Sequence, residues 1–251
     1  MINRYTKLLQ IVNEKKRIEV SKLAELLNVS QVTIRKDLDV LEDRGLLKRQ
    51  HGYAVITSTS DDINSRLAFN YDIKRKIARL AAESVSDGET IMIESGSCCA
   101  LLAEELAYNK KGITIITNST FIASYVREGN ARIVLLGGDY QSESQVLVGP
   151  LTKKCVKDFF VDKLFVGTDG YIDKIGFTGK NLMRTETVKA MAENSNKLFI
   201  LTESSKFLER GVVSQFKAEE VNYVITDSNI SEEILEGLNK QQVNVQIAKV
   251  E

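Results

Sequence analysis

The stretch Ser30–Ala54, "SQVTIRKDLDVLEDRGLLKRQHGYA", decides how the first part of the chain folds. Ser30 is a residue type that caps helix N-termini, and Gly45 is one that ends helices. The apolar residues between them recur on one helix face, at Ile34, Leu38 and Leu41. The stretch therefore predicts a helix that begins after Ser30, followed by a small β-hairpin that turns at His51 and Gly52.

Two further helices are predicted upstream of this one. The segment "INRYTKLLQIVNE" (residues 2–14) has one apolar face, formed by Ile2, Tyr5, Leu8, Leu9 and Val12. The segment "VSKLAELLNVS" (residues 20–30) predicts a second, short helix, and only "NVS" (residues 28–30) separates it from the third. Such a tight turn before a hairpin favours a winged helix-turn-helix, although a plain helical hairpin with solvated charges is also open.

Charge is unevenly placed along the chain. The whole sequence has 34 basic and 34 acidic residues, whereas residues 1–53 hold eleven Lys and Arg against seven Asp and Glu. The third predicted helix carries polar and basic residues on the faces that its apolar stripe leaves over, at Gln31, Thr33, Arg35 and Lys36. Residues 1–53, here called the head, are therefore basic, whereas the remainder of the chain is acidic. A basic segment of this kind predicts binding to nucleic acid.

The rest of the chain alternates between strand-like and helix-like segments. The strand-like runs are "TIMIE" (90–94), "GITIITN" (112–118), "ARIVLLGG" (131–138), "KLFVGTDG" (163–170), "KLFILTE" (197–203), "NYVITD" (222–227) and "VNVQIAKV" (243–250). Helical patterns lie between them, and one more precedes them, with its end at Gly88. This alternation predicts a largely parallel sheet covered by helices on both faces.

The polar segment "TSTSDDINS" (residues 57–65) has no apolar period and indicates a domain boundary near residue 57. We expect a winged helix-turn-helix DNA-binding domain in residues 1–56 and a linker in residues 57–71. Residues 72–251 then form an α/β domain for effector binding and oligomerisation.

Several chemistries are excluded by the residues that are present. The only histidine is His51, and the three cysteines show no paired or metal-ligand spacing, so we expect no disulfide framework, no metal and no nucleophilic triad. Walker and dinucleotide loops are missing, which predicts no cofactor. With no apolar run long enough for a membrane and no signal-peptide pattern, a cytoplasmic protein is expected.

Ligands of open α/β sheets bind beyond the carboxyl ends of the strands, and the loops expected there are rich in polar residues. In "ESGSCC", Gly96 permits close approach, Ser97 offers a hydroxyl, and a helix N-terminus near Cys98 offers N–H groups to a phosphate. That N-terminus could also lower the pKa of Cys98. Lys206 could meet the same phosphate, and carboxylates suited to sugar hydroxyls are present at Glu94, Asp169 and Glu186.

These motifs together resemble the DeoR-type bacterial transcription regulators. Residues 30–54 look like the family's winged helix, which includes an Arg-x-Asp-Leu run and a terminal His-Gly-Gly-Ala. The motifs "ESGSC", "TNS", "GG", "VGTDG" and "SSKF", in this order, are similar to its effector domain. That domain is related in fold to ribose-5-phosphate isomerase and glucosamine-6-phosphate deaminase. The resemblance implies an α/β chain with an N-terminal winged helix-turn-helix.

Carried onto this sequence, the resemblance implies two sets of site residues. The DNA-binding set is Ser30, Gln31, Thr33, Arg35, Lys36, Lys48, Arg49 and His51. The effector-binding set is Glu94, Gly96, Ser97, Cys98, Asn118, Gly138, Asp169 and Lys206. The sequence departs from the family at three positions: Glu94 replaces an Asp, Cys98 a Thr or Ser, and Tyr53 the second wing glycine.

The function expected is that of a DNA-binding transcriptional regulator. The resemblance implies a repressor of a sugar or polyol utilisation operon, relieved by a phosphorylated sugar or polyol. Its partners would be double-stranded operator DNA, that effector and further copies of itself, in a dimer or tetramer. One alternative is a sugar-phosphate isomerase or deaminase with a helical appendage and Asp169 or Glu186 as base, although the isomerases' Lys-Gly-x-Gly-Gly run is missing. Another is a constitutive DNA binder.

Overall fold

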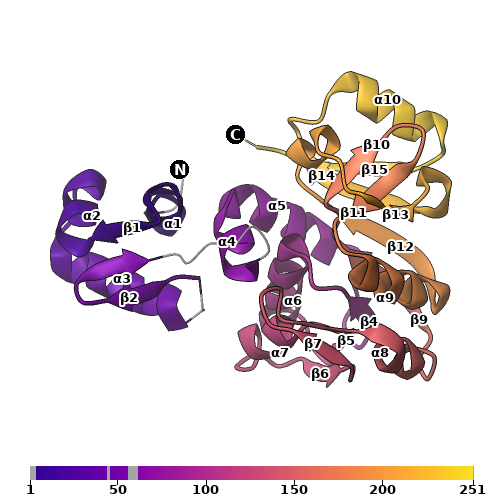
Figure 1. Cartoon of the computed structure of the whole chain (residues 1–251), viewed down its shortest axis with the longest axis horizontal. Coiled ribbons are helices and arrows are strands. Elements are labelled where there is room, and N and C mark those ends of the chain that lie inside the picture. Colours follow the sequence, from indigo (N-terminus) through magenta and orange to yellow (C-terminus); the bar gives the residue numbers. More distant parts are fainter. Residues whose placement is uncertain (1–3, 44–45, 56–61, 251) are drawn as a thin grey trace. The chain divides into compact units, whose positions relative to one another are not determined.

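The computed structural model describes residues 4–43, 46–55 and 62–250. The chain forms two compact units, Met1–Asp72 and Ile73–Glu251 (Figure 1). The predicted helix end at Gly45, the apolar residue Ile2 and the first residues of the predicted linker lie outside the described residues.

The first unit contains the three predicted helices and the predicted hairpin. Its elements are α1 (Arg4–Lys15), β1 (Arg17–Glu19), α2 (Val20–Leu27), α3 (Gln31–Asp43), β2 (Lys48–Gln50), β3 (Tyr53–Val55) and α4 (Ile63–Ala68). The apolar faces meet in a small core whose fully buried side chains include Leu8, Leu9, Val12, Leu23, Ile34 and Leu38. The helical periodicity of the sequence therefore identified the core of this unit correctly.

The turn between α2 and α3 is short, since Asn28 ends α2 and Ser30 already begins α3. Asn28 adopts the left-handed conformation (φ 51°) that ends α2. Ser30 caps α3, since its Oγ accepts a hydrogen bond from the Thr33 N–H at 3.1 Å. The predicted cap is thereby confirmed, and the cap fixes where the exposed first turn of α3 begins.

The wing is a three-stranded antiparallel sheet in the order β1-β3-β2. Its tip is formed by His51 (φ 47°) and Gly52 (φ 83°), and two successive positive φ angles fit the tight hairpin turn that matches strand twist. The predicted hairpin is confirmed, whereas β1 was not predicted because three residues are too few to show a period.

Helix α4 lies within the range predicted as a linker. It is capped by Asp62, whose carboxylate accepts hydrogen bonds from the Asn64 and Ser65 N–H groups, and it packs against α1. Leu67 is fully buried. The assignment of residues 57–71 as a linker stays a prediction, but their second half has ordered, buried structure.

The second unit is built on a seven-stranded parallel sheet. Its order is β15-β14-β12-β9-β4-β5-β6. The strands are β4 (Thr90–Ile93), β5 (Thr114–Thr117), β6 (Arg132–Leu135), β9 (Val161–Val166), β12 (Ser195–Leu201), β14 (Tyr223–Asp227) and β15 (Asn244–Ala248). Each corresponds to one of the seven predicted runs, so the parallel α/β sheet is confirmed.

The strand order reverses between β4 and β9. The chain proceeds from β4 through β5 to β6 at one edge, then returns to β9 on the other side of β4 and continues outward to β15. Loops after β4 and β9 consequently leave the sheet in opposite directions. Sheets of this kind hold their ligands at such a reversal point, beyond the carboxyl ends of the strands.

Helices and two small sheets surround the main sheet. The helices are α5 (Tyr71–Ala82), α6 (Ser97–Asn109), α7 (Thr120–Tyr125), α8 (Gly149–Val156), α9 (Leu182–Glu193) and α10 (Glu232–Lys240), with 3-10 turns η1 (Ser204–Leu208) and η2 (Ala218–Glu220). The additional strands are β7 (Asp139–Gln141), β8 (Val146–Val148), β10 (Gly170–Ile172), β11 (Gly176–Gly179) and β13 (Val213–Phe216). Neither α8 nor these strands were predicted, and α5 ends at Ala82 rather than at Gly88.

Both faces of the sheet are buried. Ile91, Met92 and Ile93 follow one another in β4 and are all inaccessible, although neighbouring residues of a strand point to opposite faces. On one face Met92 belongs to a cluster with Val188 of α9. On the other, the rings of Phe165 and Phe199 lie 4.7 Å apart. The sheet is thus a rigid support for the loops at its carboxyl edge.

Candidate functional site

The exposed face of α3 carries the side chains expected to meet DNA. Gln31, Arg35 and Lys36 are exposed, while Ile34 and Leu38 on the opposite face are buried. In the part of the chain that the structure describes, Arg35 and Lys36 form no salt bridge. Both cations are therefore directed to solvent and can reach an anionic partner.

Ser30 and Thr33 have a structural role at the start of α3. Besides the cap, their hydroxyl oxygens lie 2.9 Å apart and share a hydrogen bond. Their contact with DNA stays a prediction. The hydrogen bonds of Ser30 and Thr33 fix the backbone from which Gln31 and Arg35 project.

The two basic residues of the wing point in opposite directions. Lys48 is exposed, whereas Arg49 turns toward α3, because successive strand residues face opposite sides. The Arg49 guanidinium pairs with Asp39, and its backbone N–H donates to Glu42 Oε1 at 2.8 Å. Arg49 therefore holds the wing against α3, and its charge is already engaged within the head.

Tyr53 packs against the neighbouring strand instead of projecting at the wing tip. Its hydroxyl donates to Glu19 Oε1 at 2.9 Å, and the Arg17 guanidinium lies 4.0 Å from the ring centroid. The bond to Glu19 raises the pKa of the Tyr53 phenol. The wing tip is formed by His51 and Gly52, so Tyr53, which replaces the second wing glycine, lies in β3 beside the tip.

Asp37 of the Arg-x-Asp-Leu run is a buried structural residue that sequence reasoning did not single out. Its carboxylate accepts hydrogen bonds from Arg4 Nε at 2.5 Å and from Arg4 Nη2 at 2.9 Å. This bidentate pair ties α1 to α3. The sequence did indicate this role, because Asp37 is a charged residue within the apolar stripe formed by Ile34 and Leu38.

In the second unit, Glu94 joins the two loops at the point where the strand order reverses. Its Oε2 accepts hydrogen bonds from the Gly96 N–H at 2.8 Å and the Gly167 N–H at 3.1 Å. Its Oε1 accepts one from the Ser95 hydroxyl at 2.7 Å. The carboxylate expected to hold sugar hydroxyls thus acts first as a clamp between the loops after β4 and β9.

Gly96 lies in tight contact with the loop after β9. A Cβ atom at Gly96 would lie 3.3 Å from the Gly167 Cα, which is tighter than ordinary van der Waals contact. Because the Gly96 N–H is bound to Glu94, the N–H groups offered by α6 are those of Ser97 and Cys98, which precede the first bond within the helix, Ala100 N–H to Gly96 O. They lie at the carboxyl edge, as expected of a phosphate seat.

Cys98 is buried, and its thiol is not activated by the helix N-terminus. Its side chain is 4% exposed, and burial, together with the Glu203 carboxylate, raises the pKa of its thiol to about 12. The expectation that the helix N-terminus lowers this pKa is wrong, because desolvation of the thiolate outweighs the helix dipole here.

Thiol labelling tests this assignment. At pH 8 we expect a disulfide-forming thiol reagent to modify Cys155, which is partly exposed, well before the buried Cys98 and Cys99. All three should react once guanidinium unfolds the chain. Rapid modification of Cys98 in the folded protein, located by mass spectrometry, would contradict the buried thiol.

A buried ion pair, missed in the sequence, lies behind this helix terminus. Lys74 of α5 and Glu203 after β12 are 2% and 5% exposed, with 3.2 Å between Lys74 Nζ and Glu203 Oε2. Burial lowers the pKa of Lys74, and Glu203 opposes this shift. The sequence could have indicated this pair, because Lys74 lies on the buried stripe of α5 between Tyr71 and Ala78.

Lys206 belongs to the same cluster. It lies on η1, which is anchored because Ser204 donates to Asp227 from both its N–H (2.7 Å) and its hydroxyl (2.9 Å). The charge of Lys206 acts on both Cys98 and Lys74. The structure thus brings the predicted cation toward the start of α6, although the two segments are far apart in sequence.

Asp169 and Asn118 extend the cluster along the carboxyl edge. Asp169, after β9, accepts a hydrogen bond from the Lys180 N–H at 2.9 Å. Asn118 follows β5, whose Thr117 pairs with Ile93 beside the β4 loop. The Asn118 Nδ2 donates to Leu147 O at 3.1 Å, while its buried Oδ1 has no donor among the described residues.

Gly138 is explained by helix packing. A Cβ atom there would lie 1.8 Å from the Thr152 Oγ1 of α8, so that no other residue fits. Contact between Gly138 and an effector stays a prediction, and the structure gives this glycine a role that needs no ligand.

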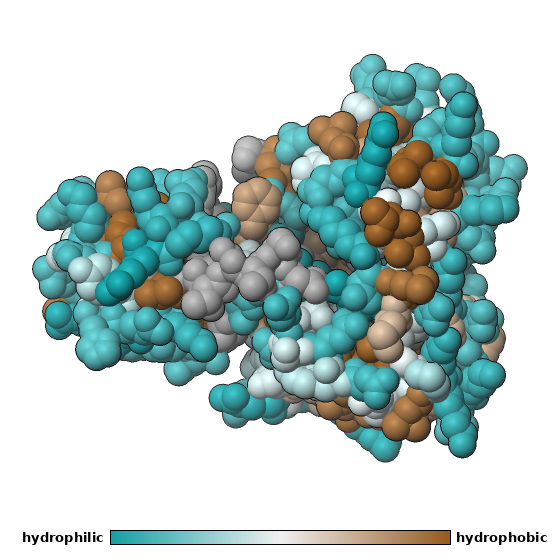
Figure 2. All heavy atoms as spheres, in the orientation of Figure 1, coloured by the Kyte–Doolittle hydropathy of each residue, from teal (hydrophilic) through white to brown (hydrophobic). Residues whose placement is uncertain are grey.

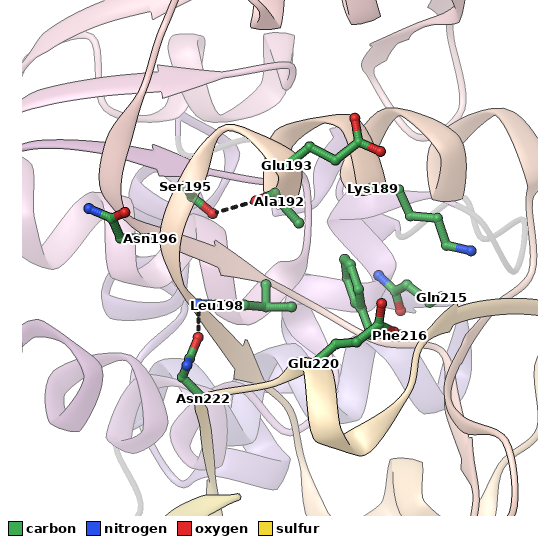
Figure 3. Close-up of a pocket in the computed structure, with 10 residues that line it drawn as sticks. All are labelled: Lys189, Ala192, Glu193, Ser195, Asn196, Leu198, Gln215, Phe216, Glu220 and Asn222. Carbon is green, nitrogen blue, oxygen red and sulfur yellow. Dashed lines mark hydrogen bonds between the residues drawn. The ribbon is translucent and has the colours of Figure 1, made fainter.

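A separate cavity of about 340 Å³ lies at the amino-terminal end of β12 (Figure 3). It is lined by Lys189, Ala192, Glu193, Ser195, Asn196, Leu198, Gln215, Phe216, Glu220 and Asn222. None of these belongs to the predicted effector set. One lining residue reaches the carboxyl edge, since Gln215 Nε2 donates to Gly167 O at 3.1 Å.

Comparison with known proteins supports the division of labour between the two units. Residues 4–60 match the DeoR-like helix-turn-helix domain, and residues 69–228 match the DeoR C terminal sensor domain. The chain belongs to the DeoR family. It is a DeoR-family transcriptional regulator rather than an enzyme, which sets aside the isomerase alternative.

This DeoR-family regulator is 29% identical to the HTH-type transcriptional regulator GolR of Listeria innocua, over 98% of both chains. It is 28% identical to the transcriptional repressor AccR of Agrobacterium fabrum, over 96% of both. Among solved structures, ribose 5-phosphate isomerase A of Methanocaldococcus jannaschii is similar over 55% of each chain, with 21% identity and a TM-score of 0.41.

Two observations complete the description of the DeoR-family chain. Among the described residues, no helix is both long enough and apolar enough to cross a membrane. Over the same residues, no group of three His, Cys, Asp or Glu side chains could hold a metal ion.

Proposed function

We propose that this DeoR-family regulator is a cytoplasmic repressor of a sugar or polyol utilisation operon, released by a phosphorylated sugar or polyol. The observation that carries the proposal is that Lys206, on η1 after β12, lies close enough to the N-terminus of α6, at the reversal point of the sheet, for its charge to act on Cys98. A phosphate group is the chemistry that a cation and free helical N–H groups recognise together. AccR, to which the chain is similar, is itself named a repressor.

The head reads DNA through α3. Arg35 and Gln31 reach base edges in the major groove, and Lys36 and Lys48 neutralise phosphates. Arg49 contributes indirectly, since its pairing with Asp39 sets the position of the wing. Ser30, Thr33 and His51 complete the proposed DNA-binding set.

A homo-oligomer follows from the small footprint of a single head, because two linked heads bind far more tightly than one. The second unit supplies the contacts. Figure 2 shows several groups of hydrophobic atoms on the drawn face of this unit. Large apolar side chains that remain exposed in it include Leu151, Phe160, Leu182, Leu208 and Val212.

The function is tested by DNA retardation with a panel of sugar phosphates. A binding site selected from random-sequence DNA serves as probe, and product assays run alongside. Release of DNA by one sugar phosphate without turnover supports the repressor. Indifference to every compound would favour a constitutive DNA binder.

Replacing Lys206 separates effector binding from DNA binding. We expect Lys206→Ala to bind DNA as the parent does but to need about tenfold or more effector for release, since a charge-assisted bond to phosphate is lost. The control is Lys240→Ala, which removes an exposed lysine paired with Glu236 on α10. An unchanged response in Lys206→Ala would remove Lys206 from the effector site.

A further inference from the structure

The carboxylate of Glu209 lies between two cations, Lys206 and Lys180. Its Oε1 is 2.9 Å from Lys206 Nζ, and its Oε2 is 3.4 Å from Lys180 Nζ. Although partial burial opposes ionisation, the two lysines hold the pKa of Glu209 below its usual value. The cation proposed to meet the effector therefore already has an anionic partner within the chain.

The backbone around Glu209 is fixed, whereas its side chain is not enclosed. The Glu209 carbonyl accepts a hydrogen bond from the Tyr171 N–H at 3.0 Å, and the Gly211 N–H donates to Thr178 Oγ1 at 2.8 Å. A Cβ atom at Gly170 would lie 2.4 Å from the Glu209 carbonyl oxygen, so the loop has no room to shift inward. The Glu209 side chain itself is 43% exposed. It can leave the lysines by rotating into solvent while the loop stays in place.

The backbone of Lys180 is held in position independently of Glu209. Its backbone N–H donates to Asp169 Oδ2 at 2.9 Å, which attaches the end of β11 to the loop after β9. When the carboxylate leaves, Lys180 and Lys206 remain as two cations beside the place it occupied. Such a pair is matched to a group with two negative charges, as a phosphate monoester carries near neutral pH.

We propose that the Glu209 carboxylate is an internal substitute for the effector's anionic group, which occupies Lys206 and Lys180 in the empty protein and is displaced by a phosphate dianion. This inference rests on the proposed function, because it takes Lys206 to be the phosphate-binding cation. Glu209 then sets the ligand concentration at which the regulator responds, since every binding event must first break its two ion pairs.

The test is calorimetric binding of inorganic phosphate to the full chain and to Glu209→Gln. We expect phosphate to bind about three- to tenfold more tightly to Glu209→Gln, the range expected from removing two partly exposed ion pairs. The matched control is Glu236→Gln, which removes the same charge from an exposed pair on α10 and should leave phosphate affinity unchanged. Adding Lys206→Ala to Glu209→Gln should abolish the gain.

The outcomes distinguish this inference from the proposed function. If phosphate binds the parent chain and Glu209→Gln equally, Glu209 is not a competitor, and the effector site still stands. Weaker binding to Glu209→Gln likewise overturns the inference alone. If neither protein binds phosphate, or if Lys206→Ala leaves binding intact, both proposals fail at this cluster.

Discussion

Arg35→Ala is expected to lose specific DNA binding while the protein stays folded. Arg35 is exposed on α3, forms no salt bridge in the described structure and projects from the capped start of the helix. Loss of one bidentate contact to a base costs about 1–3 kcal/mol, and the loss is repeated in each subunit that binds a half-site. The affinity for the selected DNA, measured by retardation, should therefore fall by about two orders of magnitude or more in a dimer.

Two lysines serve as controls for this result. Lys36→Ala should weaken binding to all sequences alike and reduce the slope of log affinity against log salt by about 0.9 for each bound subunit, as expected for one lost phosphate contact per subunit. Lys16→Ala removes a positive charge from the end of α1, where Lys16 Nζ donates to Asn13, and should have little effect. If Arg35→Ala discriminated its site from random DNA as the parent does, α3 would not be the reading helix.

Lys74→Ala is expected to destabilise the second unit more than any replacement on its surface. Removing the lysine leaves the Glu203 carboxylate, which is 5% exposed, without its ion-pair partner. Removing one partner of a buried ion pair lowers the free energy of unfolding by about 3–5 kcal/mol, because the remaining charge stays buried without compensation. Chemical unfolding followed by circular dichroism should show this as a lowered midpoint with an unchanged slope.

The matched control is Lys153→Ala, which breaks the pair between Lys153 and Glu186 at a similar distance, 2.8 Å, but with both side chains exposed. Its expected cost is about 0–1 kcal/mol. The double replacement of Lys74 by Met and Glu203 by Leu should recover most of the stability lost in Lys74→Ala, since no buried charge remains. A loss below about 1 kcal/mol in Lys74→Ala would contradict the buried pair.

Periodicity was enough to predict the regular parts of the fold. The helices of the head and all seven strands of the main sheet follow from apolar spacing, because burial on one or two faces leaves a direct trace in the sequence. The strands β1 and β7 are only three residues long and carry no such trace. Helix α4 has six residues in a polar context, and tertiary packing rather than propensity stabilises it.

The sequence was enough to predict which loops form the candidate site, but not which of their residues contact one another. The rule that ligands bind beyond strand ends pointed to Gly96, Asp169 and Lys206, and the structure places these loops at one edge. It could not show that Glu94 is bound to Gly167, since that contact joins residues 73 positions apart. For the same reason Glu209 was not recognised as the partner of Lys180.

The buried pair of Lys74 and Glu203 also limits how this regulator can change over generations. A single substitution at either residue passes through a protein with an uncompensated buried charge, so the pair can be exchanged only by two coordinated mutations. Glu209 and Lys180, whose side chains are exposed, can be replaced one at a time at little cost in folding. Under the proposed function, adaptation to a new effector can therefore proceed by single substitutions at the exposed Glu209 and Lys180, but not at the buried pair of Lys74 and Glu203.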